Sequence, residues 1–163
     1  GNRQARKPNR AVGAADRVED DEPTGSIPEG AVQLPLIYVD RLIVREGKLA
    51  ELKTAIRELA EFVAANEPRV IGYDAYFNAD ETEMTVIYLH PDSYSLAYHR
   101  KVAGPLLPPF AQLLEQQSID VFGEPAAPVL EQLRWKAELL DSGKVRIHAP
   151  LRAAAGRAQR SAG

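Results

Sequence analysis

The order of strand-like and helix-like segments between residues 36 and 124 constrains the fold of this chain more than any other feature. Strand-like segments, rich in β-branched and aromatic residues, occur at 36–44, 70–77, 84–89 and 118–122. A helical stripe with apolar residues at steps of three and four follows the first strand and consists of Leu49, Leu52, Ile56, Leu59 and Val63. A second helical segment lies between the third and fourth strands. The order strand–helix–strand–strand–helix–strand predicts a ferredoxin-like βαββαβ domain of the α+β class.

The second helix begins after the third strand, where Asp92 or Ser93 can act as its N-cap. It covers residues 94–102, and prolines then interrupt a helical pattern that is predicted to resume through Phe110, Leu113 and Leu114. Right-handed crossovers place both helices on one face of a four-stranded antiparallel sheet. The other sheet face needs a cover, and a second copy of the chain is the commonest one for a domain of this size. The sequence therefore predicts a homodimer through the open sheet face.

The chain divides into three parts by composition. Residues 1–33 are polar and rich in Gly and Pro, which is typical of a mobile N-terminal arm. Residues 34–125 form the α+β domain. Residues 126–163 form a C-terminal extension with a predicted helix over 128–141, a short strand over 144–148 and a basic tail. A structural role is expected for this extension, and none for the arm.

Charge and composition exclude several classes of function. Residues 31–125 carry fourteen acidic and eight basic side chains, which argues against a nucleic-acid-binding face. The chain has no cysteine, so disulfides and thiolate chemistry are excluded, and a cytoplasmic location is expected. It has no run of 18 apolar residues, and its basic start lacks the apolar segment of a secretory signal, so no membrane association is expected. Phosphate loops, dinucleotide fingerprints and serine-hydrolase elbows are also missing.

Three segments resemble the antibiotic-biosynthesis-monooxygenase-like domains of the dimeric α/β barrel superfamily. They are FVAANEPRVIGYDAYFN, MTVIYLHPDSYSLAYH and SIDVFGEP, within residues 36–124. The resemblance implies a dimeric α/β barrel and a monooxygenase that acts on quinols or polyketide aromatics without a cofactor. The heme-degrading branch of the superfamily has an Asn where this chain has Asp40, and a Trp near the second helix, whereas the only Trp here is Trp135. Heme degradation is therefore disfavoured.

His90 and His99 are the first candidate catalytic residues. Histidine titrates near neutral pH and can move protons. A cofactor-free oxygenase needs a base that forms a substrate anion, and the two rings converge if the second helix packs over the sheet. Alternatively, His90 caps the helix and His99 is half-exposed. No metal site is expected, because the three histidines (90, 99 and 148) lack ligand spacing.

Asp40 is the third candidate catalytic residue, because a carboxylate in a strand that otherwise looks buried is costly unless it is paired. It is predicted either to form an ion pair, with Arg100 as one partner, or to act as a general base with a raised pKa. Four tyrosines are candidate substrate-binding residues that orient a phenolic ligand: Tyr38, Tyr73, Tyr88 and Tyr98. The alternative is that they fill the core or the dimer interface.

Two functions of different classes remain open from the sequence. The first is a cofactor-independent monooxygenase of small aromatic or quinol-type molecules, which uses a site between sheet and helices. The second is a non-catalytic dimer of the same fold that binds a small ligand or serves as an assembly module. They are distinguished by whether Asp40, Tyr88, His90 and His99 face one cavity.

Overall fold

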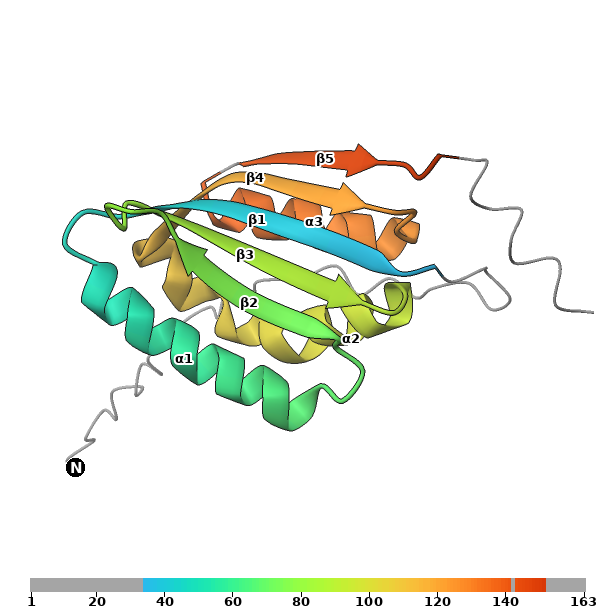
Figure 1. The fold of residues 1–163 in the computed structure, drawn as a ribbon, viewed down its shortest axis with the longest axis horizontal. Helices are drawn as coiled ribbons and strands as arrows, with labels where there is room; N and C mark the ends of the chain where they lie inside the picture. Colours follow the sequence, from blue (N-terminus) through green and yellow to red (C-terminus); the bar gives the residue numbers. More distant parts are fainter. Residues whose placement is uncertain (1–33, 142, 152–163) are drawn as a thin grey trace, which may run out of the picture.

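The computed structural model describes residues 34–141 and 143–151 and has the α+β architecture expected from the sequence (Figure 1). The strands are β1 (Leu36–Val44), β2 (Gly72–Phe77), β3 (Glu83–His90), β4 (Leu114–Phe122) and β5 (Lys144–His148). The helices are α1 (Leu49–Asn66), α2 (Ser93–Ala103) and α3 (Ala127–Leu139). The arm predicted for residues 1–33 and most of the basic tail lie outside the described residues.

The five strands form one sheet with the order β2-β3-β1-β4-β5. The first four pair antiparallel in the ferredoxin-like arrangement, which confirms the predicted topology. The fifth strand comes from the C-terminal extension and pairs parallel to β4, so the sheet is mixed. The short strand predicted at residues 144–148 is thus confirmed. The structure adds that this strand belongs to the main sheet.

The three helices pack against one face of the sheet (Figure 1). Alternate β1 residues are buried beneath them, and Leu52, Leu96 and Leu133 bring one core side chain from each helix. The extension therefore shares a single hydrophobic core with the α+β domain. The opposite sheet face carries apolar side chains that are exposed in the single chain: Ile37, Tyr76, Ile87 and Phe122. No helix in residues 34–141 and 143–151 is long and apolar enough to cross a bilayer.

The segment between α2 and β4 differs from the prediction. Two short 3₁₀ turns, Gly104–Leu106 and Pro108–Gln112, replace the expected continuation of the helix. Proline lacks the backbone N–H that an α-helix requires, so the three prolines here favour tight turns. The chain then enters β4 at Leu114, four residues before the predicted start of the strand. The helical assignment of Leu114 was therefore wrong.

Candidate functional site

Ionisable and aromatic side chains gather beneath the centre of the sheet, on the face that the helices cover. This buried polar cluster consists of Tyr38, Asp40, Glu67, Tyr73, Tyr88, His90, His99 and Lys136. The strands position Tyr38, Asp40, Tyr73, Tyr88 and His90, whereas Glu67 follows α1, His99 lies on α2 and Lys136 lies on α3. Charged groups are rarely buried in such number, and their concentration marks the candidate site.

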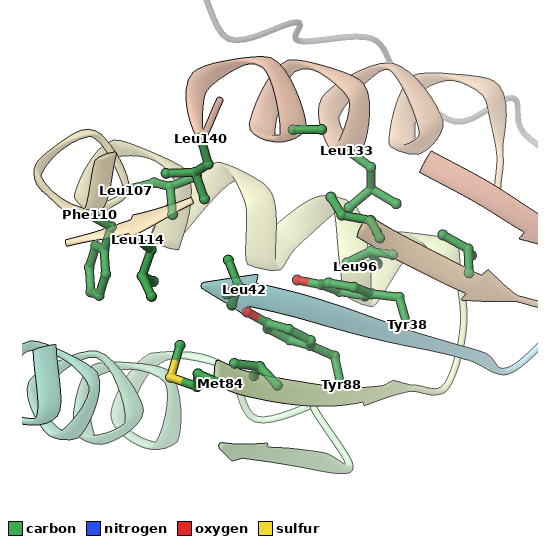
Figure 2. Packing of buried hydrophobic residues seen from close by; sticks show 14 of the residues in the cluster. Tyr38, Leu42, Met84, Tyr88, Leu96, Leu107, Phe110, Leu114, Leu133 and Leu140 are labelled. Atoms are coloured by element: carbon green, nitrogen blue, oxygen red, sulfur yellow. The ribbon is translucent and has the colours of Figure 1, made fainter. Parts of the chain in front are cut away.

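Three tyrosines at matching positions on neighbouring strands form the aromatic part of the cluster. Tyr88 of β3 pairs with Tyr38 of β1 on one side and with Tyr73 of β2 on the other. The Tyr38 and Tyr88 rings stack with their centroids 3.8 Å apart, and Tyr73 meets Tyr88 edge-on at 4.9 Å. Figure 2 shows that the Tyr38 and Tyr88 side chains point the same way, toward Leu42. Burial raises the pKa of all three hydroxyls, so they stay protonated and can donate hydrogen bonds.

The hydroxyls of Tyr38 and Tyr73 have unused hydrogen-bonding capacity. Both oxygen atoms are buried, and neither makes a hydrogen bond of ordinary geometry within the described residues. Both hydroxyls interact with the Tyr88 side chain. Of the two residues, Tyr73 lines a cavity and can meet a ligand, whereas Tyr38 lines none of the described cavities.

Glu67 and His99 form the acid–base pair of the cluster. The Nδ1 atom of His99 lies 2.9 Å and 3.0 Å from the two carboxylate oxygens of Glu67, and both side chains are buried. Burial raises the pKa of Glu67 from 4.5 to about 7. Burial, with Arg100 and Lys136 nearby, lowers the pKa of His99 well below its usual value, so the ring is neutral at neutral pH. The hydrogen bond between the Glu67 carboxyl group and the Nδ1 atom of His99 thus contains one proton.

His90 lies beside this pair. Its ring centroid is 5.6 Å from that of His99, and its Nδ1 atom lies 2.9 Å from the hydroxyl oxygen of Ser95. Its Nε2 atom is buried without a hydrogen-bond partner among residues 34–141 and 143–151. Burial, together with His99, lowers the pKa of His90 to about 4. Asp92, which accepts a hydrogen bond from the Ser95 backbone, caps α2 instead of His90.

Asp40 forms a buried ion pair with Lys136, which contacts its Oδ2 atom. Gln116 lies within 3.4 Å of the other carboxylate oxygen and donates a hydrogen bond to the carbonyl of Ser118 at 2.9 Å. The Lys136 ammonium group also lies 5.2 Å and 5.4 Å from the ring centroids of Tyr88 and Tyr38. The sequence suggested Arg100 as the partner of Asp40, whereas the ion pair in the structure joins Asp40 to Lys136.

A narrow cavity borders the cluster, and we call it the inner cavity. Its volume is about 20 Å³, and its polar wall is formed by Asp40, Tyr73, Tyr88 and Lys136. His90 and His99 do not line it, although the ring centroid of His99 is 5.3 Å from that of Tyr88. The four residues that were expected to face one cavity are thus neighbours in one cluster, but only Asp40 and Tyr88 face this space. By the criterion drawn from the sequence, this outcome favours the dimer that binds a ligand over the monooxygenase.

Two larger grooves open on the outer side of Glu67. The α1 groove, about 330 Å³, runs between the end of α1 and the start of β2, and both Glu67 and Tyr73 line it. The α2 groove, about 390 Å³, is lined by Glu67 together with Tyr94 and Tyr98. Tyr98 is 47% exposed and is the predicted site residue that lies outside the buried polar cluster.

Glu67 and Lys136 were missed in the sequence for different reasons. Glu67 lies in the segment Asn66-Glu67-Pro68, which was interpreted only as the end of a helix because of its proline. Lys136 lies on the buried face of α3, three residues after Leu133. A lysine within an apolar stripe is a usable signal, because a buried ammonium group requires a carboxylate partner.

The described residues contain no group of three or more His, Asp or Glu side chains placed to bind a metal ion. The side chains of the cluster can support proton transfer and the stabilisation of charge. His99 and Glu67 can move a proton, the tyrosine hydroxyls can donate hydrogen bonds, and Lys136 supplies a positive charge.

Comparison with known proteins supports the fold. No family model matches the sequence, and no curated protein matches it. Among solved structures, MupZ from Pseudomonas fluorescens is 16% identical with a TM-score of 0.54, over 72% of this chain and 93% of that chain. A conserved protein of unknown function from Bacteroides thetaiotaomicron, also described as a possible oxidoreductase, is 18% identical with a TM-score of 0.50, over 56% of this chain and 98% of that chain. At these identities the likeness shows a shared fold.

Structural neighbours also include proteins provisionally named antibiotic biosynthesis monooxygenases. One from Caulobacter crescentus CB15 is 29% identical with a TM-score of 0.41, over 47% of this chain and 78% of that chain. Another protein with this name, from Nitrosomonas europaea, is 20% identical with a TM-score of 0.46, over 52% of this chain and 83% of that chain.

The Asp40–Lys136 pair can be tested with a double-mutant cycle. We expect Asp40→Asn and Lys136→Met each to lower the free energy of unfolding by about 3–5 kcal/mol, because each leaves one buried charge without its partner. The double variant should lose clearly less than the sum of the two. Urea unfolding at one fixed protein concentration measures these values. Additive losses would show that the two side chains do not stabilise each other.

The raised pKa of Glu67 predicts a pH-dependent effect on stability. The unfolded carboxyl titrates near 4.5 and the folded one near 7, so the folded state holds more protons in that range. The contribution of Glu67 is fully present below pH 4.5 and is lost as the pH rises through 7. We expect Glu67→Gln to become more stable than the wild type as the pH rises through 7, by about 1–3 kcal/mol at pH 8.

Urea unfolding of both proteins between pH 4 and pH 8 measures this difference. The lowered pKa values of His90 and His99 produce the opposite slope in both proteins. This slope cancels only in part, because the Glu67 carboxylate raises the pKa of His90, so the comparison is read at neutral pH and above, where both rings are neutral. Glu61→Gln is the matched control, because Glu61 is an exposed residue of α1. A difference between wild type and Glu67→Gln that stays constant with pH would contradict the raised pKa.

Proposed function

We propose that this chain is a cofactor-independent monooxygenase of small phenolic or quinol-type molecules, with the Glu67–His99 pair as the catalytic base. The observation that carries the proposal is the buried Glu67–His99 pair beside three tyrosines. A neutral histidine that is hydrogen-bonded to a carboxylate is a common form of biological base. The structural neighbours named antibiotic biosynthesis monooxygenases support the same class of activity.

Glu67 is the member of the pair that can meet a substrate. It lines both grooves, whereas His99 lines none of the described cavities. When the Glu67 carboxyl group is ionised, it accepts a hydrogen bond from the Nδ1–H group of His99, 2.9 Å away, and its other lone pairs can accept a proton from a substrate. Because the pKa of Glu67 is about 7, the active form becomes more populated as the pH rises through neutrality.

The substrate is proposed to bind in the α1 groove, whose volume of about 330 Å³ suits a compound of one or two rings. Apolar residues of α1 form one side of this groove, and Glu67 and Tyr73 belong to its lining. A hydrogen bond from the Tyr73 hydroxyl would orient a phenolic oxygen, and Tyr38 and Tyr88 support Tyr73 from the sheet. Tyr98 is proposed to contact substrates that extend into the α2 groove.

The proposed reaction balances without a bound cofactor. A substrate carbon that carries two hydrogens reacts with dioxygen, gains a carbonyl oxygen and releases one water. The substrate supplies all four electrons that dioxygen needs. Glu67, oriented by His99, removes the first proton to form the substrate anion, and it returns that proton to the oxygen that leaves as water. Asp40 is proposed to hold the Lys136 ammonium group in place rather than to act as the base.

A homodimer is proposed to form through the open sheet face. In the single chain Ile37, Ile87 and Phe122 are each about 40% exposed on this face, and such apolar groups are usually covered in soluble proteins. The helices cover only the opposite face. A second copy would bury these side chains without altering the candidate site, which lies beneath the helices.

The second candidate function is a dimer that binds a small ligand without transforming it. The observation that favours it is the small volume of the inner cavity, about 20 Å³, which leaves no room for a substrate beside Asp40 and Lys136. In that case the grooves would hold a ligand, and the polar cluster would serve only to fix the packing.

Oxygen consumption with a panel of quinols and anthrone-like phenols tests the proposal. We expect uptake with at least one compound, at a rate that rises with pH through about 7 in the wild type. His99→Ala should lower the rate roughly 100-fold or more, because the Glu67 carboxylate loses the hydrogen-bonded ring that orients it as the base. The matched control is His148→Ala, which removes a histidine on the opposite sheet face. Tight binding without uptake across the panel would favour the second candidate.

A further inference from the structure

The inner cavity has a lining suited to a small apolar molecule. Most of the residues around it are aliphatic or aromatic, and they come from α1, the sheet, the 3₁₀ turns and the end of α3. The apolar lining consists of Leu42, Ile56, Leu59, Met84, Val86, Leu107, Phe110, Leu114 and Leu140. Figure 2 shows several of these side chains gathered around the hydroxyl ends of Tyr38 and Tyr88. The cavity thus lies within the hydrophobic core.

The size of the inner cavity restricts its occupant. A volume of about 20 Å³ holds one molecule of the size of water or of a diatomic gas, and it cannot hold an aromatic ring. The apolar part of the lining suits a gas molecule, since apolar cavities take up gases such as xenon. The size excludes an organic substrate, and at the polar wall a gas molecule competes with one water molecule for the space.

The polar wall of the same cavity provides a positive charge. The Lys136 ammonium group belongs to this wall, together with Asp40 and the hydroxyl-bearing rings of Tyr73 and Tyr88. Charges interact strongly in such a buried setting, because the surrounding medium screens them poorly. A molecule that enters neutral and becomes an anion is stabilised there by the ammonium group and by the tyrosine hydroxyls.

We infer that the inner cavity is a dioxygen-binding site, in which Lys136 stabilises the negative charge that dioxygen acquires on reduction. The inference rests on the proposed function, since it assigns a place to the second substrate of that reaction. Tyr73 lines both the inner cavity and the α1 groove. A dioxygen molecule in the cavity therefore lies one side chain away from a substrate in the groove.

The electrons and protons of this step balance. The substrate anion passes one electron to dioxygen, which gives a substrate radical and superoxide. The two combine, on displacement of the Tyr73 ring, to a peroxide that takes up one proton. The O–O bond then breaks as the second hydrogen leaves the same carbon, which leaves a carbonyl group and one water. Dioxygen is the only oxidant required, and the balance needs no proton from Lys136, whose pKa is lowered by burial and raised by Asp40.

Xenon-pressurised crystals and methyl relaxation under dissolved dioxygen test the site directly. In the wild type we expect a xenon atom in the inner cavity, and a selective paramagnetic enhancement of relaxation at the Met84, Val86 and Leu114 methyl groups. Val86→Ile adds one methyl group to the lining and should abolish both signals. The matched control is Val145→Ile, which makes the same change in β5 away from the cavity and should retain both signals.

Kinetics connect the site to turnover. With a substrate that supports oxygen uptake, Val86→Ile should raise the KM for dioxygen about tenfold and leave the Kd of the organic substrate unchanged. Val145→Ile should change neither value. An unchanged KM for dioxygen in folded Val86→Ile would overturn the assigned role of the cavity.

The binding experiments are independent of activity, so the two proposals can fail separately. Absence of xenon and of methyl enhancement in the wild type would overturn the dioxygen site even if oxygen uptake occurs. Retention of both signals in folded Val86→Ile would overturn its location. If the gas signals are present but no phenol supports uptake, the proposed function fails and the gas-binding site stands. The wild-type measurement decides the inference even if the variant does not fold.

Discussion

The buried ion pair between Asp40 and Lys136 is the interaction on which the rest of the structure depends. Asp40 lies in the central part of β1, and Lys136 lies on the helix of the C-terminal extension. Burying either charge without the other would cost several kcal/mol, so the ion pair favours packing of the helix against the strand. The extension is for this reason an integral layer of the domain. Its docking also places an ammonium group beside the rings of Tyr38 and Tyr88.

Burial also shifts the pKa values of the ionisable groups beside the Asp40–Lys136 pair. It raises the pKa of Glu67 and lowers the pKa of both His90 and His99, so near neutral pH both rings are neutral and Glu67 is the group of the three that titrates. Loops of the α1–β2 and β3–α2 connections deliver Glu67 and the start of α2 to the edge of the sheet. The cluster thus combines a base, hydrogen-bond donors and a fixed cation in one dry region, which is what a reaction through an organic anion requires.

The topology was predictable because it follows from local periodicity: β1 and α1 match the expected segments, and the strand order follows from the crossovers. The gathering of Tyr38, Tyr88, His90 and His99 followed from strand parity and helix placement. Glu67 and the pairing of Asp40 with Lys136 were not predicted, because both depend on contacts between residues far apart in sequence. The early start of β4 was not predicted, because the turn that begins at Pro108 runs almost directly into the strand and the sequence shows no clear boundary between them.

The central claim is that Glu67 controls the protonation of His99, and nitrogen NMR of the 15N-labelled histidine ring tests it most directly. Between pH 5 and pH 9 we expect the His99 ring to remain neutral. Its proton should reside on Nδ1 above a pH of about 7, where the Glu67 carboxylate accepts it, and move to Nε2 below that pH, where Glu67 is protonated. A ring that becomes positively charged near its ordinary pKa, or a tautomer that does not respond to pH, would contradict the account.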